Sequence, residues 1–384
     1  MKKKIIDTRA ELEECVRFLS QQERFSIDLE FDKNRYRYGF NLCLIQIFAG
    51  DACLIIDPLA EDIGVEQLFP VIENPAIEKI VYSFGEDLRL LHSLGCFPKN
   101  VFDIAIAMRL LNYPPASLAS SLLEVLDIEI SKSAQKSNWF LRPLSDKQID
   151  YAARDVLYLL DMKDILVKEA EEMGVLDWID EENAVIDTLN YSDIDNNSYL
   201  KEKDKQGLSE FAFHIFKRLL EFREIKAEGL NRPSYQIIDK EYLRELSERP
   251  KQIYRFEKIR GIHKRLKNNA FKEELRAKRE ASEKEAAALN LSQEEDAYKR
   301  LSYEEYQKRK ATRMLQDDVK KKVFKPIQAL IAQNHGEHVV TYILGNRLME
   351  DLALGKLEQL RSYKRVLIER YADELGIDVT PYLG

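Results

Sequence analysis

The stretch Phe25-Ser-Ile-Asp-Leu-Glu-Phe31 decides how the first half of this chain is organised. Its apolar residues predict a short strand, in which the carboxylates of Asp28 and Glu30 lie two residues apart. Because side chains alternate along a strand, both carboxylates point to the same face. Two like charges this close are tolerated in wet surroundings, when one carboxylate is protonated, or when a divalent cation lies between them. The last of these options would make the stretch part of an active site.

Further strands and helices follow this stretch. Three strand candidates at residues 26–30, 42–49 and 52–57 are close enough in sequence to pair as antiparallel neighbours, and Gly50-Asp51 forms the turn between the last two. Alternating helix and strand signals then predict parallel βα units, so the expected fold is α/β, with a mixed sheet and flanking helices. The later elements are a helix at 65–72, a strand at 79–84, a helix at 86–94 ended by Gly95, a strand at 101–103 and a helix at 146–173 ended by Gly174.

The second half of the chain is expected to be helical. Residues 191–207 are polar and rich in turn formers, which predicts a linker after a domain at 1–190. Within 205–270 there are 16 lysines and arginines against 9 acids, a net charge of +7, whereas the remainder of the chain carries −15. The expected parts are a basic helical domain at 208–270, a charged helical connector at 271–315 that is solvated or mobile, and a further helical module at 316–384.

Composition limits the class of protein. With 384 residues, 45% of them hydrophobic, the chain is long enough for two or three domains with cores of their own. The net charge of −8 argues mildly against a protein that coats nucleic acid with its whole surface, although a local basic face remains possible. The apolar run after Met1 stops at Asp7, and no stretch approaches the roughly 18 apolar residues of a membrane span. The four cysteines show no CxxC spacing, so a reducing cytoplasm is the expected location.

Two further acidic signals lie in the predicted α/β domain. Gly85-Glu-Asp87 begins a helix, where an acid often serves only to pair with the helix dipole. Tyr151-Ala-Ala-Arg-Asp155 places Tyr151 and Asp155 one helical turn apart, although Asp155 could simply pair with Arg154 or Lys147. Each signal is weak when it is taken alone.

A single arrangement, a shared metal site, would explain the presence of all four acids in one domain. If the carboxylates converge they need compensating positive charge, and two divalent ions about 4 Å apart are the known solution for in-line attack on a phosphodiester. Oxygen-only ligands favour hard ions, so Mg²⁺ or Mn²⁺ is the expected cofactor. Tyr151 would then orient or activate the attacking water.

These motifs carry a family resemblance. Asp28-Leu-Glu30, Gly85-Glu-Asp87-Leu and Tyr151-Ala-Ala-Arg-Asp155 resemble the three exonuclease motifs of the DEDDy branch of 3′-to-5′ exonucleases. Over residues 5 to 190 the chain also resembles the ribonuclease D family, in the order Leu42-Cys-Leu-Ile-Gln-Ile47, Leu54-Ile-Ile-Asp-Pro58, Val101-Phe-Asp-Ile-Ala105, Ser131-Lys-Ser-Ala-Gln-Lys-Ser-Asn-Trp139 and Arg142-Pro-Leu144.

The helical half resembles the HRDC domains of that family more faintly. The first copy is indicated by Phe222-Arg223, Asn231-Arg-Pro233, Ile238 and Tyr242-Leu-Arg-Glu-Leu-Ser-Glu-Arg-Pro250. A second copy is indicated by Leu344-Gly-Asn-Arg-Leu348 and Arg361-Ser-Tyr-Lys-Arg-Val-Leu367. The resemblance implies a ribonuclease H-like domain followed by two HRDC-like modules.

The resemblance also implies residue roles. The metal ligands would be Asp28, Glu30, Asp87 and Asp155, and Tyr151 would position the nucleophilic water; these five are the expected catalytic residues. Three departures from the family pattern flank them, namely Leu29 between the first two acids, Tyr82-Ser83 before the second motif and Asn138 before the tryptophan. The expected contacts to nucleic acid are Leu29, Tyr82, Lys132, Gln135, Lys136 and Trp139, although a polar loop before a helix explains Lys132, Gln135 and Lys136 equally well.

Two further sets of basic residues have alternative explanations. Tyr36 and Tyr38, interleaved with Lys33, Arg35 and Arg37, could stack on bases, or they could belong to an exposed hairpin loop. The basic side chains of the 208–270 domain could bind phosphates, or they could be an ordinary solvated helical face. They are Arg249, Lys251, Arg255, Lys258, Arg260, Lys264 and Arg265.

The activity that the resemblance implies is metal-dependent 3′-to-5′ hydrolysis of RNA with a single-stranded 3′ end, in the trimming of stable precursors such as tRNA. No membrane and no obligate protein partner are expected. One alternative is a DNA exonuclease of the same superfamily, because the metal chemistry does not depend on the 2′-hydroxyl. The other is a catalytically silent RNA-binding scaffold, which the presence of all four acids and the tyrosine disfavours.

Overall fold

The computed structural model describes residues 2–130, 134–192, 199–294, 303–356 and 360–383. The chain divides into two compact units. The first contains Met1–Glu30, Leu42–Asp193 and Tyr306–Gly384, and the second contains Phe31–Asn41 and Ile194–Glu305. None of the helices described is long and apolar enough to cross a membrane.

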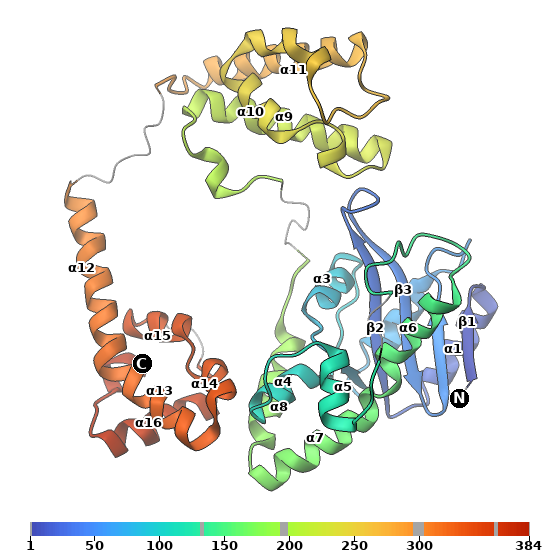
Figure 1. The fold of residues 1–384 in the computed structure, drawn as a ribbon, viewed down its shortest axis with the longest axis vertical. Coiled ribbons are helices and arrows are strands. Elements are labelled where there is room, and N and C mark those ends of the chain that lie inside the picture. The colour runs from blue at the N-terminus through green and yellow to red at the C-terminus, as the bar shows by residue number, and fades with distance from the viewer. Residues whose placement is uncertain (1, 131–133, 193–198, 295–302, 357–359, 384) are drawn as a thin grey trace. The chain divides into compact units, whose positions relative to one another are not determined.

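A mixed six-stranded sheet lies in the N-terminal part of the first unit (Figure 1). β3 and β4 are antiparallel, whereas β5 is parallel to both β2 and β6. The prediction of antiparallel strands followed by parallel βα units is therefore confirmed. The strands follow the spatial order β1-β4-β3-β2-β5-β6 and comprise β1 Lys2–Ile6, β2 Arg24–Lys33, β3 Phe40–Ala49, β4 Ala52–Ile56, β5 Glu78–Val81 and β6 Val101–Asp103.

The edge strand β1 was not predicted from the sequence. It pairs in parallel with β4 from Lys2↔Ala52 to Ile6↔Ile56. Its three lysines hide the apolar alternation that marks a strand. Lysine is common on edge strands, because a charged side chain there discourages pairing with another chain.

Helices surround the sheet, and α6 packs against β4 (Figure 1). The single helix expected at 146–173 is interrupted at Tyr158 and forms two helices, of which α6 packs against β4 while α7 packs against both α4 and β5. Gly174 ends α7 with a φ of 67°, as predicted. The helices in this part are α1 Arg9–Leu19, α2 Phe69–Ile72, α3 Gly85–Ser93, α4 Ile104–Leu110, α5 Leu118–Leu126, α6 Asp146–Leu157, α7 Leu159–Met173 and α8 Leu176–Ala184. We call residues 2–192 without 31–41 the α/β part.

The cysteines of the α/β part all belong to its interior. Cys15, Cys43, Cys53 and Cys96 are buried, and none of them forms a disulfide in the part of the chain that the structure describes. Cys43 and Cys53 lie under α6 in one apolar cluster with Trp139 and Ala152. The helix that carries Tyr151 and Asp155 is therefore fixed to the sheet by apolar packing.

The C-terminal module, residues 306–383, completes the first unit. Helix α14 packs against α4, and Val340 and Ile343 share one apolar core with Ile104. Gly336 has a φ of 107°, and a Cβ added there would lie 2.1 Å from the Asn112 side chain, so only glycine fits this approach. The helices are α12 Tyr303–Val319, α13 Lys325–His335, α14 Glu337–Ile343, α15 Asn346–Ala353, α16 Ser362–Leu375 and α17 Thr380–Leu383, with a π-helical turn at Lys320–Phe324.

Within its described residues, the second unit contains the α-helices α9, α10 and α11, short 3-10 helices and the hairpin loop at 31–41. Tyr38 packs on the apolar core of the unit, and its backbone N–H donates to Asn231 Oδ1 at 3.3 Å. The Tyr235 hydroxyl donates to the carbonyl oxygen of Arg35 at 3.2 Å, so the loop is held at two points. The helices are α9 Glu210–Leu230, α10 Lys240–Glu248 and α11 Asn269–Ala288.

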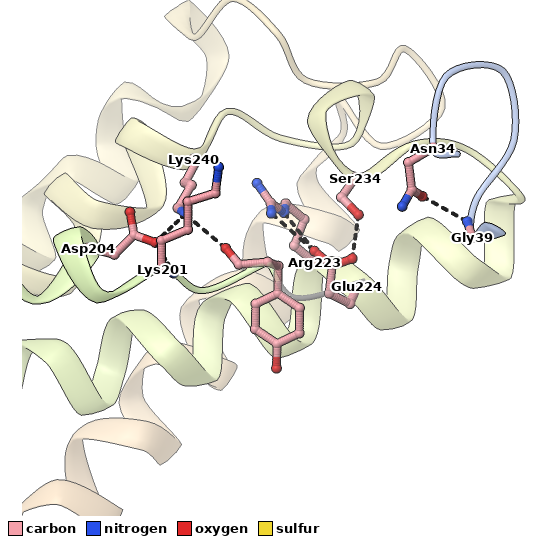
Figure 2. A network of polar contacts seen from close by, with 9 residues as sticks. Asn34, Gly39, Lys201, Asp204, Arg223, Glu224, Ser234 and Lys240 are labelled. Atoms are coloured by element: carbon pink, nitrogen blue, oxygen red, sulfur yellow. Dashed lines mark hydrogen bonds and ion pairs between the residues drawn. The ribbon is translucent and has the colours of Figure 1, made fainter. Parts of the chain in front are cut away.

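Two ion pairs, one buried and one partly exposed, lie in the second unit, as Figure 2 shows. Arg223 and Glu224 pair at 3.1 Å, and the Ser234 hydroxyl donates to the same glutamate. Lys240 pairs with Asp204 at 2.6 Å and donates to a backbone carbonyl oxygen. Each charge is thereby compensated where water is scarce.

The connector expected at 271–315 differs from the prediction over its first half. Helix α11 is not a solvated connector, because it packs along α9 and buries Phe271 and Leu275 in the core of the second unit. The Phe222 and Phe271 rings stack at 5.8 Å. The many charges of α11 hid this narrow apolar face from sequence reading. The predicted linker at 191–207 lies partly outside the described residues.

Candidate active site

Strand β2 brings the first two acids to one face of the sheet. Oxygen atoms of Asp28, Glu30 and Asp155 all lie within 4.8 Å of one another. The two strand residues are half-buried, and Asp155 is buried. Residues 125 positions apart in the sequence thus converge on one point.

Helix α6 supplies the third acid together with Tyr151. The helix begins with a capping box, in which Ser145 and Gln148 each bond to the other's backbone N–H. Tyr151 and Asp155 lie one turn apart, and the tyrosine hydroxyl donates a hydrogen bond to the Asp155 carboxylate. This bond holds the phenol over the acidic cluster.

Asp87 approaches the cluster from the first turn of α3. It is buried, and the backbone N–H of Leu29 donates to its carboxylate. Its charge acts on both Asp28 and Glu30. It lies outside the group of three carboxylates that meet within 4.8 Å.

The four acids hold protons more tightly than free carboxylates do. Burial raises the pKa of Asp28 well above its usual range, and the charges of Asp87, Asp155 and Glu30 raise it further. Burial, and then the charges of Asp155 and Asp87, do the same for the pKa of Glu30. Burial raises the pKa of Asp87 to about 7 and that of Asp155 to about 7. Bringing four acids together therefore costs free energy unless a proton or a cation compensates them.

The donor set tests whether a metal ion fits this position. All the available ligand atoms are carboxylate oxygens, which hard divalent cations prefer. Among the described residues, the groups that offset the negative charge include the backbone N–H groups of Leu29 and Asp87 and the Tyr151 hydroxyl. The residues present fit a divalent cation.

Burial raises the pKa of the Tyr151 phenol, which is the opposite of the change that would activate it as a base. Burial, followed by the charges of Asp155 and Glu30, raises the pKa of Tyr151 well above its usual range. The hydroxyl therefore keeps its proton at neutral pH. As a neutral group it can orient a water molecule by hydrogen bonding.

The predicted RNA contacts lie in different environments. Leu29 is buried between the two strand acids, and the Tyr82 hydroxyl donates to the carbonyl oxygen of Ala116 at 2.8 Å. Gln135 and Lys136 are exposed, whereas Lys132 is outside the described residues. Trp139 is only 3% exposed, and its ring lies 6.1 Å from that of Tyr151. Trp139 thus packs behind the tyrosine, and its contact with RNA stays a prediction.

Asp103 is a buried acid in the stretch Val101–Ala105, for which the sequence predicted no role. Its carboxylate caps α4 by accepting a hydrogen bond from Ala105 N at 2.9 Å. A strand that ends in aspartate just before a helix is the signal for such a cap.

Comparison with known proteins agrees with this geometry. Residues 3–171 match a family model described as 3′-5′ exonuclease. Ribonuclease D of Bartonella henselae is 29% identical over 68% of this chain and 65% of its own length, and ribonuclease D of Desulfotalea psychrophila is 32% identical over 63% and 66%. The chain thus spans slightly less than two thirds of the length of these two relatives.

A solved structure extends the similarity to the whole fold. Escherichia coli RNase D, described as an exoribonuclease involved in structured RNA processing, matches with a TM-score of 0.68 at 20% identity, covering 97% of this chain and 99% of that one. The predicted ribonuclease H-like fold with helical modules after it is confirmed.

The fold and the matched model define a class, because residues 3–171 form a 3′-5′ exonuclease domain with acids at the places where the three motifs were expected. The relatives narrow that class. They are named ribonuclease D, and this chain is similar to them over 68% and 63% of its length.

Proposed function

We propose that this protein hydrolyses phosphodiester bonds at the 3′ ends of RNA, one nucleotide at a time, with divalent metal ions. The observation that carries the proposal is the convergence of Asp28, Glu30 and Asp155 within 4.8 Å, beside the hydroxyl of Tyr151. Relatives named ribonuclease D support the choice of RNA over DNA.

The four acids would hold the metal. Asp28, Glu30 and Asp155 offer converging oxygens, and Asp87 would complete the set from α3. Two Mg²⁺ or Mn²⁺ ions, when bound, supply the Lewis acidity that activates water and stabilises the departing 3′ oxygen. The raised pKa values of the acids mean that cations and protons compete for the same oxygens.

Tyr151 would orient the attacking water. Its hydroxyl donates to Asp155, so an oxygen lone pair of the phenol stays free to accept a hydrogen bond from water. Apolar packing against Trp139 holds the ring in this position. The Tyr151 hydroxyl would thus fix the direction from which the water attacks, without itself accepting a proton.

The parts around the site would bind the RNA chain. Leu29 and Tyr82 are proposed beside the terminal nucleotide, and Lys132, Gln135, Lys136 and Trp139 near the scissile phosphate. The helices of the second unit and the C-terminal module are proposed as HRDC-like modules. In the second unit the exposed cations Arg249, Lys251 and Arg255 would contact phosphates. Stable RNA precursors such as tRNA and a cytoplasmic location remain parts of this proposal.

The test uses a 5′-labelled RNA with an unpaired 3′ tail, incubated with Mn²⁺ or with EDTA. We expect a ladder of products that shorten from the 3′ end only when Mn²⁺ is present. Asp28→Asn should lower the rate by more than the roughly 10–100-fold that is typical of residues that merely support metal ligands, while RNA binding stays within about twofold. Gel shift on the same RNA measures the binding.

Asp150→Asn is the matched control, because Asp150 lies on α6, pairs with Lys3 and is half-exposed outside the cluster. It should retain the wild-type rate. Faster removal of deoxynucleotides from a matched DNA would overturn the choice of RNA. If the protein binds the RNA but does not cleave it in Mn²⁺, it would be an RNA-binding scaffold and not an enzyme.

A further inference from the structure

Asp103 ends β6 directly beside the end of β5. Its partner in the parallel pair is Val81, the last residue of β5. The carboxylate is buried, at 7% exposure. It is therefore placed at the carboxyl ends of two parallel strands, where the chain turns from β5 into α3.

This one carboxylate accepts three backbone hydrogen bonds. Oδ1 accepts from Ser83 N at 2.8 Å and from Ala105 N at 2.9 Å, and Oδ2 accepts from Phe84 N at 3.0 Å. The first and third of these bonds hold the turn that precedes α3, and the second caps α4. Asp103 thus ties the starts of two helices together.

The turn that Asp103 holds is conformationally expensive. Ser83 has a φ of 57°, in the left-handed region that non-glycine residues rarely occupy. Asp87 lies four residues beyond it, in the first turn of α3. A strained turn needs fixed partners, and the two bonds to Asp103 supply them.

Asp103 is itself fixed from its other side. Its backbone N–H donates to Asn183 Oδ1 at 2.8 Å, and this asparagine is buried on α8. Asp103 is also close enough to Asp87 for its charge to raise the pKa of that acid. The buried side chains of Asn183 and Asp103 therefore connect α8 to the turn that precedes Asp87.

We infer that Asp103 is a positioning residue for the metal site, which sets the direction of Asp87 by holding the Ser83–Phe84 turn in its left-handed form. The inference rests on the proposed function, because it assumes that Asp87 is a metal ligand. Asp103 itself does not reach the reacting atoms. Its effect is expected on metal affinity first and on turnover as a consequence.

The experiment measures Mn²⁺ affinity by isothermal titration of the full-length protein, without RNA. Asp103→Ala removes all three acceptor bonds and should weaken Mn²⁺ binding about tenfold or more, as is usual for residues that support metal ligands. Asp103→Asn keeps an acceptor oxygen, so it should fold and give an intermediate loss. Asp239→Asn is the control, since Asp239 accepts from Glu241 N and Tyr242 N at the start of α10 in the second unit.

Ser83→Gly separates positioning from charge. Glycine adopts a positive φ without strain, so adding Ser83→Gly to either Asp103 variant should recover at least about threefold of the lost Mn²⁺ affinity. The Ser83 side chain is exposed, and the single Ser83→Gly variant should bind Mn²⁺ as the wild type does. A loss caused only by removing a negative charge would not be recovered by a backbone change.

Three results would overturn the inference. These are wild-type Mn²⁺ affinity in Asp103→Asn, no recovery on adding Ser83→Gly, or an equal loss of affinity in the Asp239→Asn control. Failure of the proposed function is a separate result, because the wild-type protein itself would then neither bind Mn²⁺ nor shorten RNA.

Discussion

At the residue scale, the acidic cluster makes the metal-free protein sensitive to pH. An aspartate whose pKa is near 4 in the unfolded chain and about 7 in the fold binds a proton more tightly when folded. Such a group does not weaken the fold below about pH 4, and its full cost is reached only above about pH 7. The destabilisation therefore grows as the pH rises from 4 to 7, and Asp87 and Asp155 both contribute.

A bound cation should remove this cost where it is largest. In EDTA the melting temperature should fall between pH 5 and pH 8. Mn²⁺ at about 100 times its Kd should add roughly 2.7 kcal/mol of stability at pH 8, or about 5 °C or more, and less at pH 6, where protons compete. Differential scanning fluorimetry measures both. A Mn²⁺ shift that is equal at pH 6 and pH 8, or that persists in Asp28→Asn, would contradict this account.

At the scale of elements, α6 carries both Tyr151 and Asp155, so its start fixes part of the site. The reciprocal bonds of the capping box run from Gln148 N to Ser145 Oγ at 3.4 Å and from Ser145 N to Gln148 Oε1 at 3.1 Å. The Ser145 N–H is thereby satisfied, and the Gln148 N–H, which also donates to the Ser145 carbonyl oxygen at 2.9 Å, gains a second acceptor.

Removing this cap should loosen the helix. We expect Ser145→Ala to lower the free energy of unfolding by about 1 kcal/mol, because the Gln148 N–H loses its side-chain acceptor and keeps only the backbone oxygen of Ser145 at 2.9 Å. Urea unfolding followed by circular dichroism measures the change. Ser117→Ala is the comparison, since Ser117 caps α5 by accepting from Ser120 N, with a further contact to the Ser120 hydroxyl, and α5 carries none of the four acids. A smaller loss in Ser145→Ala than in Ser117→Ala would argue against the box.

Local patterns in the sequence were enough to predict much of the fold and of the candidate site. The alternation around Phe25 and the turn at Gly50-Asp51 predicted strands that are present, and the spacing of four between Tyr151 and Asp155 predicted their common face. Strand β1 and the packed face of α11 were missed because lysines, glutamates and arginines obscure their narrow apolar sides. The break at Tyr158 depends on what α6 and α7 pack against, which is tertiary information.

At the scale of the whole molecule, the C-terminal module is joined to the α/β part by a buried glutamate within the first unit. Glu182 on α8 accepts a hydrogen bond from the Tyr363 hydroxyl at 2.7 Å and pairs with Lys364 at 2.7 Å. Arg361 lies 3.6 Å from the same carboxylate. Next along α8, Asn183 holds Asp103, so the helix that receives the module also supports the turn before Asp87.

Removing this carboxylate should separate the module from its support. Glu182→Ala leaves the half-buried charge of Lys364 without its carboxylate partner, and we expect a loss of about 3 kcal/mol in the free energy of unfolding. Limited proteolysis should also cut the module sooner. Glu172→Gln, at an exposed position on α7, is the control and should stay within about 0.5 kcal/mol of the wild type. Equal stabilities for both variants would mean that apolar packing alone joins the module.

The four buried cysteines give the chain a natural reporter of its own unfolding. Burial raises the pKa of Cys15 to about 12 and that of Cys53 to about 11, and it raises the pKa of Cys96 as well. Alkylating reagents attack the thiolate, so the native protein should resist iodoacetamide until the α/β part opens. Since all four sulfurs belong to that part, the mass gained by alkylation counts its opening alone, without an introduced label and independently of the second unit.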